Sequence, residues 1–355
     1  MDLVGDLDSY ERRDWDDGTV DDTLRMAVIG LGWFGHDMAL PSIRTADYAE
    51  PTVVVSGSPD VREETAAEYG ATAIDYDGYE AGVATDDYDA VYVATPNALH
   101  PSHVETAAGL GKHVICEKPL AATVEGAERA VAACEDAGVR LMTAYRLQTD
   151  PRIRRVRELV RDGVVGEPRL LHGNFSFRML ADGGDPDQWR LDADLAGGGA
   201  LPDIGVYPLN TSRFIVDREP TAVSAETCGE GAFADVDRLA TLLVSFGDVT
   251  GSFTADFDAQ ADDELTVVGD EGRIRIENAF EPREQRRIGV RRGEHSATID
   301  PAPVDDLREE FDYFAHAVLT DGEIEPDGRD GLSDVRTMVA AYDAAEEGRR
   351  VELDG

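Results

Sequence analysis

Short apolar runs alternate with amphipathic segments along the first part of the chain, between Leu24 and Ala144. Short apolar runs bounded by turn residues are typical of buried strands, and longer amphipathic segments are typical of helices. The predicted strands are 24–29, 52–56, 71–75, 89–94, 113–116 and 140–144. Helices are predicted after Gly35 as far as Ile43, over 60–69, before Leu110 and over 123–137. This alternation predicts a doubly wound parallel sheet.

After Tyr145 the pattern changes to strands with few helices between them. The predicted helices here are 151–161 and 201–216, and the predicted strands are 167–177, 221–227, 237–246, 250–258, 264–268 and 273–277. Because no long helix separates most of these strands, we expect a mostly antiparallel sheet. Two helices close the chain, the second over 331–347, and the first carries the core-facing stripe Leu307, Phe311, Phe314 and Val318.

The two patterns predict an α/β fold with two domains. An N-terminal Rossmann dinucleotide-binding domain is expected over 24–146, and a C-terminal α+β domain with a large, mostly antiparallel sheet over 147–355. Residues 1–23 form an acidic arm whose large apolar anchors are Tyr10 and Trp15. Two interpretations of the arm remain open: a frayed terminus, or a strap over a neighbouring subunit.

Acidic residues outnumber basic ones by 73 to 33, which gives a formal net charge of −40. Lys112 and Lys118 are the only lysines, so nearly all of the positive charge is arginine. Such a charge strains a compact chain at low ionic strength, and at molar salt, where the screening length is ~3 Å, the repulsion largely disappears. We therefore expect a halophilic protein, for which nucleic acid and anionic membranes are unfavourable partners.

The cysteines and the start of the chain indicate a cytoplasmic protein. Cys116, Cys134 and Cys228 form no C-x-x-C pair, so neither a disulfide framework nor a metal site is expected from them. The first 25 residues lack the apolar segment of a signal peptide. No stretch approaches the ~20 apolar residues of a membrane span.

A G-x-G-x-x-G fingerprint, Gly30-Leu31-Gly32-Trp33-Phe34-Gly35, follows the first predicted strand and precedes a helix. In this context Gly30 permits the tight turn, Gly32 lets a pyrophosphate approach the backbone, and Gly35 lets the helix pack on the strand. The alternative, a tight turn without a ligand, is disfavoured by the strand–turn–helix setting. The motif therefore predicts dinucleotide binding.

The second strand ends in Ser56-Gly57-Ser58, where an NAD enzyme usually carries an acidic residue for the ribose 2′-hydroxyl. Asp60 follows only four residues after Ser56, and Arg62 is nearby. Serine hydroxyls and an arginine suit a 2′-phosphate, so NADP is favoured over NAD. Arg62 can equally be a solvated helix arginine, and NAD remains possible.

A lysine at a strand end and a tyrosine on a later helix are the candidate catalytic pair. Lys118 stands in E-K-P at the end of the fifth strand, where it can hold charge beside a nicotinamide; the Lys118–Pro119 bond is a candidate for the cis form. Asp203 and Tyr207 lie four residues apart after Gly197-Gly198-Gly199, on one helix face. A nearby ammonium favours a phenolate, so Lys118 can activate Tyr207 as a base. A surface lysine and a buried structural tyrosine are the alternatives.

His100 and His103 have no accompanying carboxylate or thiol cluster at ligand spacing. We therefore expect no metal site, and we expect His100 to line the cleft at the start of its helix.

Taken together, these motifs resemble the family of glucose–fructose oxidoreductase and inositol dehydrogenase, over nearly the whole chain from Leu24. The motifs that carry the resemblance are G-L-G-W-F-G, V-S-G-S at 55–58, T-P-N-A-L-H at 95–100, G-K-H-V-I-C-E-K-P at 111–119, A-Y-R at 144–146, D-P-D-Q-W-R-L at 185–191 and G-G-G-A-L-P-D-I-G-V-Y-P-L-N at 197–210. One departure is the lack of the basic residue that some NADP-using members carry soon after the second strand.

The resemblance implies Lys118, Asp203 and Tyr207 as the catalytic group. The cofactor-binding set that we expect is Gly30, Gly32, Trp33, Phe34, Gly35, Ser56, Ser58, Arg62, Thr95, Asn97, His100, Glu117 and Lys118. The substrate-binding set is Arg146, Trp189, Arg190, Asp203 and Tyr207. The family also implies a homodimer or homotetramer formed through the C-terminal sheet.

The implied reaction is NADP-dependent oxidation of an aldopyranose at the anomeric carbon to its lactone, with D-xylose as the expected sugar. Two alternatives remain: an enzyme that keeps its NADP through oxidation of one sugar and reduction of another, and a non-catalytic NADP-binding sensor or regulator. Because aldoses differ by a hydroxymethyl group or one stereocentre, the sequence does not fix the sugar.

Overall fold

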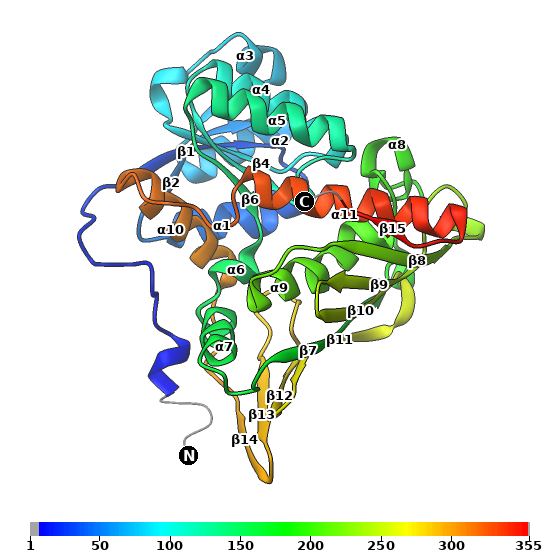
Figure 1. Cartoon of the computed structure of the whole chain (residues 1–355). Helices are drawn as coiled ribbons and strands as arrows, with labels where there is room; N and C mark the ends of the chain where they lie inside the picture. The colour runs from blue at the N-terminus through cyan, green and yellow to red at the C-terminus, as the bar shows by residue number, and fades with distance from the viewer. Residues whose placement is uncertain (1–6, 354–355) are drawn as a thin grey trace. The chain divides into compact units, whose positions relative to one another are not determined.

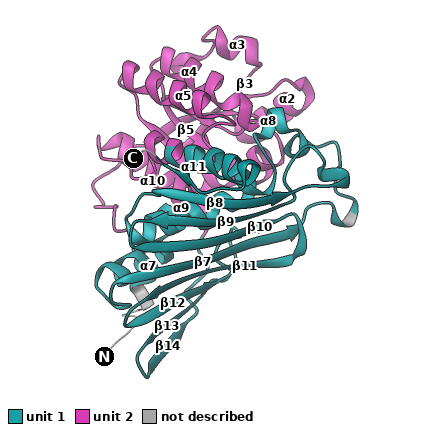
Figure 2. Cartoon of the chain, turned by 45° about the vertical axis from the view of Figure 1, so that its right-hand side comes forward, with its two compact units in different colours: residues 1–13, 147–304, 333–355 teal, residues 14–146, 305–332 magenta. Residues whose placement is uncertain are grey.

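The computed structural model describes residues 7–353 (Figure 1). The chain divides into two compact units, one formed by residues 14–146 and 305–332 and the other by residues 1–13, 147–304 and 333–355 (Figure 2). We call them the Rossmann unit and the sheet unit. The chain leaves the Rossmann unit after Arg146 and returns to it at Asp305.

The Rossmann unit contains a six-stranded parallel sheet in the order β3-β2-β1-β4-β5-β6. The strands are β1 (Leu24–Ile29), β2 (Ala49–Val55), β3 (Thr72–Ile74), β4 (Ala90–Val93), β5 (His113–Glu117) and β6 (Leu141–Ala144). All four residues of β4 and of β6 are buried, as expected for strands covered on both faces. The order reverses between β1 and β4, which is where a doubly wound fold binds its ligand.

The helices of this unit are α1 (Leu40–Thr45), α2 (Pro59–Tyr69), α3 (Tyr76–Glu80), α4 (His100–Gly109), α5 (Val124–Ala137) and α10 (Asp306–Leu319), with the 3-10 turns η3 (Thr85–Asp87) and η4 (Asn97–Leu99). Helices α2, α4 and α5 lie close to the predicted segments, whereas α3 and the two 3-10 turns were not predicted. The helix after the fingerprint differs from the expectation, because it begins as a π-helical segment, η2 (Phe34–Ala39), in which the Leu40 N–H donates to the Gly35 carbonyl five residues back. Pro41 has no N–H to donate to the Asp37 carbonyl four residues back, so a regular α-helix cannot continue through this point.

Helix α10 shares the hydrophobic core of the Rossmann sheet. Leu307, Phe311 and Phe314, from the predicted stripe, are buried, and Phe311 meets Tyr92 of β4 edge-on at 5.0 Å between ring centroids. The sequence placed this helix in the C-terminal domain. Periodicity shows that a helix has an apolar face, but it does not show which hydrophobic core that face packs on. Here α10 packs on the core of the six-stranded sheet.

The sheet unit contains nine strands in the order β14-β13-β12-β11-β7-β10-β9-β8-β15. Their bounds are β7 (Pro168–Arg178), β8 (Ala222–Cys228), β9 (Leu239–Phe246), β10 (Val249–Asp256), β11 (Asp258–Gly269), β12 (Gly272–Glu277), β13 (Arg287–Arg292), β14 (His295–Ile299) and β15 (Val351–Glu352). Every pair is antiparallel except β7 with β10. This confirms the mostly antiparallel sheet and adds three strands that were not predicted, β13, β14 and β15.

The other helices lie in the sheet unit or begin at its boundary. They are α6 (Arg146–Thr149), α7 (Pro151–Arg161), α8 (Ala193–Ala196), α9 (Val206–Val216) and α11 (Gly328–Glu347), with η1 (Leu7–Tyr10), η5 (Ala181–Gly183), η6 (Trp189–Leu191), η7 (Leu201–Gly205) and η8 (Gly231–Phe233). Within the described residues, every helix is too short or too polar to cross a bilayer.

The N-terminal arm packs on its own chain. Trp15 meets Tyr313 of α10 edge-on, with 5.6 Å between ring centroids, and Tyr10 is fully buried. Arg12 donates to Glu158 of α7 at 2.9 Å. The described part of the arm is therefore held by side-chain contacts within one chain, which a frayed terminus would lack.

Candidate functional site

The glycine turn after β1 has the geometry that a dinucleotide requires. Gly30 has φ +98°, and an added Cβ there would lie 2.7 Å from the Ala94 carbonyl oxygen. A Cβ on Gly35 would lie 2.1 Å from the Gly30 carbonyl oxygen, whereas a Cβ on Gly32 would meet no described atom within 4 Å. Gly30 and Gly35 therefore allow the turn to close, and Gly32 leaves the backbone accessible. Of the two aromatic residues in the motif, Trp33 is 63% exposed and Phe34 packs against the core.

At the end of β2, Arg62 folds back towards the strand. Its Nη1 donates to the Ser56 carbonyl at 2.8 Å, so the guanidinium is held beside the strand end. The Ser56 hydroxyl accepts from the Ser58 N–H at 3.2 Å, and the Ser58 side chain, at the N-terminus of α2, makes no capping hydrogen bond. The structure thus brings together the two serines and the arginine that the sequence singled out.

Thr95 follows β4, on the same sheet edge. Its Oγ1 is buried without a hydrogen-bond partner among the described residues. A buried hydroxyl without a partner is costly, so this atom is suited to a bound polar group. Asn97 begins the turn η4 and is buried.

His100 is fully buried, which corrects the expectation that it lines a cleft. Its Nε2 lies 2.8 Å from the Thr95 carbonyl oxygen and its Nδ1 lies 3.0 Å from the Pro119 carbonyl oxygen. Burial lowers the pKa of His100 to about 4, so the ring is neutral and donates to one carbonyl at a time. His100 therefore ties the loop after β4 to the loop after β5 and acts as a positioning residue.

Glu117 and Lys118 lie at the carboxyl end of β5, and the Lys118–Pro119 bond is cis as expected. Glu117 accepts from the Tyr92 hydroxyl at 2.6 Å and from the Lys118 N–H at 3.3 Å. Burial raises the pKa of Glu117, and the Lys118 charge opposes that shift. The carboxylate thus has fixed partners directly beside the candidate catalytic lysine.

A second buried acid, Glu310 of α10, belongs to the same cluster and was missed from the sequence. Both of its carboxyl oxygens are buried without a hydrogen-bond partner in the described chain. Burial and the negative charge of Glu117 raise the pKa of Glu310 well above its usual range, with Arg146 opposing and Asp306 reinforcing the shift. This environment therefore favours the neutral carboxylic acid form of Glu310 more than water does.

Arg146 is committed to this cluster rather than to a sugar. Its Nε lies 3.4 Å from a carboxylate oxygen of Asp306, and the two side chains are 5% and 0% exposed. The expectation that Arg146 binds substrate is therefore not supported, because its charge balances the buried acids. Because Arg146 follows β6, the sequence places it at the sheet edge where ligands bind. In the structure its side chain instead points to Asp306 of α10.

In the sheet unit, the glycine-rich joint is clamped by Asp237 and Tyr342. Asp237 accepts from the Gly199 N–H at 2.6 Å, from the Leu201 N–H at 2.8 Å and from the Tyr342 hydroxyl at 2.5 Å. A Cβ on Gly198 would lie 2.0 Å from the Tyr342 hydroxyl oxygen. The glycines are required because the backbone passes this close to the clamp.

Asp203 and Tyr207 follow the clamp, on the π-helical segment η7 and the first turn of α9. Asp203 lies 3.5 Å from Arg190 Nε, and the Arg190 guanidinium stacks over the Trp189 ring at 4.7 Å. The Tyr207 ring packs near Phe175 and Phe280, with centroid distances of 5.7 and 6.3 Å. Of the predicted sugar-binding residues, Asp203, Tyr207, Trp189 and Arg190 thus lie in the sheet unit, where Arg190 contacts both Asp203 and Trp189.

The predicted residues therefore form two groups. Lys118 and the cofactor residues belong to the Rossmann unit, and Asp203, Tyr207, Trp189 and Arg190 belong to the sheet unit. That the two groups converge on one substrate stays a prediction. Asp237, Tyr342, Glu310 and Asp306 were missed, because no local motif marks an acid whose partners come from distant segments.

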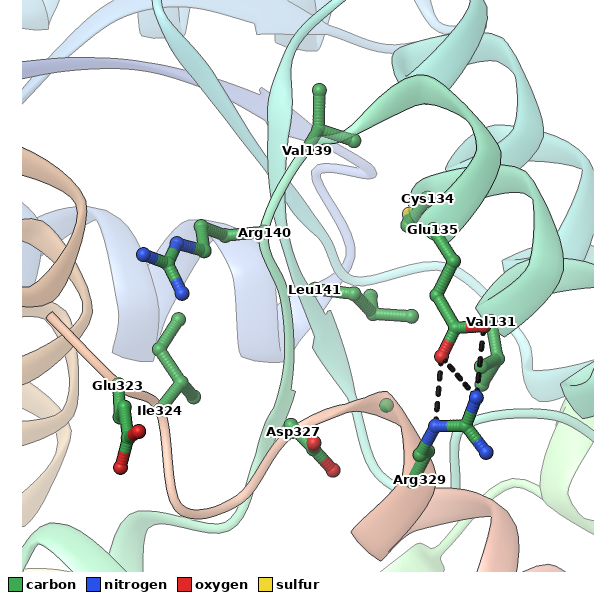
Figure 3. A pocket seen from close by; sticks show the side chains of 11 residues that line it. Val131, Cys134, Glu135, Val139, Arg140, Leu141, Glu323, Ile324, Asp327 and Arg329 are labelled. Atoms are coloured by element: carbon green, nitrogen blue, oxygen red, sulfur yellow. Dashed lines mark hydrogen bonds and ion pairs between the residues drawn. The ribbon is translucent and has the colours of Figure 1, made fainter. Parts of the chain in front are cut away.

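A cavity of about 410 Å³ lies elsewhere in the Rossmann unit, between α5, β6 and the loop before α11 (Figure 3). Both arginines that line it are already engaged: Arg329 forms hydrogen bonds with Glu135 at 2.7 and 2.9 Å, and Arg140 with Asp321. None of the predicted site residues lines this cavity.

Family models and known proteins match both units. Residues 24–145 match the oxidoreductase family with an NAD-binding Rossmann fold, and residues 153–275 match the GFO/IDH/MocA C-terminal domain. D-xylose 1-dehydrogenase [NADP(+)] of Haloarcula marismortui is 43% identical over 97% of this chain and 98% of that protein. D-xylose 1-dehydrogenase (NADP(+)) 2 of Haloferax volcanii is 31% identical over 93% of this chain and its own full length.

Among solved structures, an aldose–aldose oxidoreductase from Caulobacter crescentus, complexed with glycerol, superposes with a TM-score of 0.88. It is 33% identical, and the match covers 93% of this chain and all of that one. With both family models matched and a 43% identical relative over nearly the full length, this chain belongs to the GFO/IDH/MocA family of oxidoreductases.

Proposed function

We propose that this chain is an NADP-dependent sugar 1-dehydrogenase that oxidises D-xylose at its anomeric carbon to D-xylonolactone. The observation that carries the proposal is the 43% identity, over 97% of the chain, to a protein named for this activity. The chain also retains both chemical groups that the reaction needs, a lysine after β5 and an aspartate–tyrosine pair after the glycine joint.

The Rossmann unit fits NADP. The open backbone at Gly32 and the buried, unpaired Thr95 hydroxyl suit the pyrophosphate and a polar group of the cofactor. The guanidinium of Arg62, held at the end of β2 with Ser56 and Ser58, suits a 2′-phosphate better than a 2′-hydroxyl. NADP, when bound, supplies the hydride acceptor.

We assign the remaining chemistry to residues of this chain. Tyr207, as the phenolate that the Lys118 ammonium favours, accepts the proton of the anomeric hydroxyl and becomes the neutral phenol. Asp203, which is already paired with Arg190, orients a sugar hydroxyl, and Trp189 and Arg190 shape the sugar site. Glu117 fixes the backbone at Lys118, and His100 fixes the loop beside it.

A second function is favoured by one specific likeness, the 33% identical aldose–aldose oxidoreductase. An enzyme of that kind would oxidise one aldose and reduce another without releasing its NADP. The two functions differ in whether the nucleotide exchanges with solution between turnovers.

Initial rates over a panel of aldoses, with NADP and with NAD in molar KCl, test the proposal. D-xylose with NADP is expected to give the highest kcat/KM, and NADPH should accumulate in solution. Protein that is purified with bound nucleotide, and that turns over two aldoses without added NADP, would support the second function. A protein that binds NADPH but oxidises no aldose would instead be a sensor.

We further propose a cytoplasmic homo-oligomer that works at high salt and pairs through the nine-stranded sheet. Leu170 of β7 and Leu243 of β9 are 43% and 54% exposed, which supports an apolar contact on that sheet. Light scattering of the wild type and of a Leu170→Glu/Leu243→Glu variant tests the interface. The variant is expected to be the smaller species.

A further inference from the structure

Three ligand-type side chains meet where the N-terminal arm passes the end of α10. His316 lies in the last turn of α10, and Asp16 and Asp17 lie in the arm. One ligand atom from each lies within 4.8 Å of the other two. His316 Nε2 is 3.5 Å from an Asp17 carboxylate oxygen and 4.0 Å from an Asp16 carboxylate oxygen. We call these three residues the arm cluster.

The His316 ring is buried but its Nε2 is not satisfied. Its side chain is only 9% exposed, and Nε2 has no hydrogen-bond partner among the described residues. Both carboxylate oxygens stand farther from it than the 2.7–3.2 Å of an ordinary N–H···O bond. A buried imidazole nitrogen that faces two carboxylates at these distances indicates that something belongs between them.

The spacing suits a metal ion. Zinc binds histidine nitrogen and carboxylate oxygen at about 2.0–2.2 Å, so two ligands of a tetrahedral site stand roughly 3.4 Å apart. The separations of 3.5 and 4.0 Å from Nε2 lie near that value. We propose that the arm cluster is a divalent-metal site for Zn²⁺, with His316 Nε2 and one oxygen from each of Asp16 and Asp17 as ligands and water in the remaining position.

The surroundings of the arm cluster orient its ligands, as outer partners do in metal sites. The Tyr48 hydroxyl donates to Asp16 at 2.9 Å, and the Thr19 N–H and hydroxyl donate to Asp17 at 3.0 and 2.6 Å. The Trp15 ring packs against the His316 ring at 5.4 Å between centroids. Asp17 is 62% exposed, so water and metal can reach the site from solvent.

A metal here would fasten the arm to α10, and it would do so independently of the proposed reaction. Neutral histidine and two carboxylates carry two negative charges, which one dication balances. Without the ion, the two carboxylates repel each other in a chain that already has a net charge of −40. The alternative is a protonated His316 that forms a simple ion pair with the two acids.

Calorimetric titration of the chelator-stripped full chain with Zn²⁺ tests the proposal. The titration is done in molar potassium nitrate, because nitrate binds zinc weakly. We expect one Zn²⁺ per chain, with binding weakened about tenfold or more in His316→Gln and in Asp17→Asn. His295→Gln, which changes an exposed histidine of β14, should bind as the wild type does.

Tryptophan fluorescence provides a second measurement that does not depend on activity. Zn²⁺ should change the emission of the wild type and leave that of Trp15→Phe unchanged, because Trp15 touches the proposed ligand. If the wild type binds no Zn²⁺, or if Asp17→Asn, at an exposed position, binds with unchanged affinity, the site is an ion pair and the proposal is wrong.

Discussion

Tyr207 carries the chemical proposal at the scale of single residues. Its ring is packed near Phe175 and Phe280, so apolar contacts that phenylalanine can also make help to set its position. Tyr207→Phe should therefore keep the fold and NADPH affinity but lower kcat about 10²–10⁴-fold, the usual contribution of a general base. Steady-state kinetics and NADPH fluorescence titration measure the two effects. Turnover close to that of the wild type would remove Tyr207 from the proton transfer.

Glu310 gives a prediction about pH. A carboxyl whose pKa is raised on folding binds its proton more tightly in the folded chain, so its stabilising effect is complete below the unfolded value and is lost as pH rises. The pKa of Glu310 is raised well above its usual range by burial and by Glu117. Glutamine imitates the neutral acid at every pH.

Glu310→Gln should therefore gain stability over the wild type as pH rises above the unfolded pKa of a glutamate, about 4.3, by about 1.4 kcal/mol per pH unit at most. Denaturant unfolding at a series of pH values measures the difference. Glu64→Gln, at an exposed position of α2, serves as the control and should show no such trend. A constant difference between Glu310→Gln and the wild type would mean that Glu310 does not hold a proton.

The residues that could be predicted from sequence are those whose surroundings are local. The glycines of the fingerprint are marked by their spacing after a strand, and Lys118 follows its own strand. Glu310 and Asp237 could not be predicted, because an ordinary acid on a helix or loop gains its role only when the fold brings it beside Glu117 or Gly199. The pairing of Arg146 with Asp306, which does not support the predicted contact with substrate, could not be predicted for the same reason.

At the scale of elements, the glycine-rich joint is the segment on which Asp203 and Tyr207 depend. Asp237→Asn keeps one acceptor oxygen but turns an amide donor towards a backbone N–H, either that of Gly199 or that of Leu201. We expect a loss of stability of about 1–3 kcal/mol and a lower kcat, with NADPH affinity unchanged. Asp235→Asn, at a neighbouring exposed position, is the matched control. An unchanged kcat in Asp237→Asn would mean that the clamp does not position Tyr207.

Most elements could be predicted because their apolar period is clear. The hairpin of β13 and β14 was missed because β13, R-I-G-V-R-R, offers only Ile288 and Val290 as apolar positions among arginines. The π-helical segments η2 and η7 were predicted as ordinary helix. Both contain or precede a proline, Pro41 or Pro202, whose missing N–H favours a wider turn.

At the scale of the whole molecule, the net charge of −40 predicts a strong dependence on salt. The screening length falls from about 10 Å at 0.1 M to about 3 Å at 1 M, which removes most of the repulsion between excess carboxylates. The Tm should rise between 0.1 and 2 M KCl, although exposed ion pairs weaken over the same range. Thermal unfolding monitored by circular dichroism measures it. A Tm that is flat or falls with KCl would show that the excess charge is not what limits stability.

Both sheets could be predicted from the sequence, but the division of the chain between them could not. The alternation of apolar runs fixes the order of elements along the chain, whereas the packing of α10 depends on which core its stripe fits. The apolar stripe alone does not say which core it fits. The structure shows that Phe311 and Phe314 belong to the core of the Rossmann sheet.

This return of α10 limits how the chain can be cut or recombined. A gene fragment that stops after Arg146 would encode the six parallel strands but omit the aromatic side chains that cover Met26 and Tyr92. Such a fragment should aggregate, and a chimaera that exchanges the cofactor half between relatives must transplant 305–332 together with 14–146. During synthesis, the nucleotide-binding half cannot complete its core until the segment that contains α10 has left the ribosome.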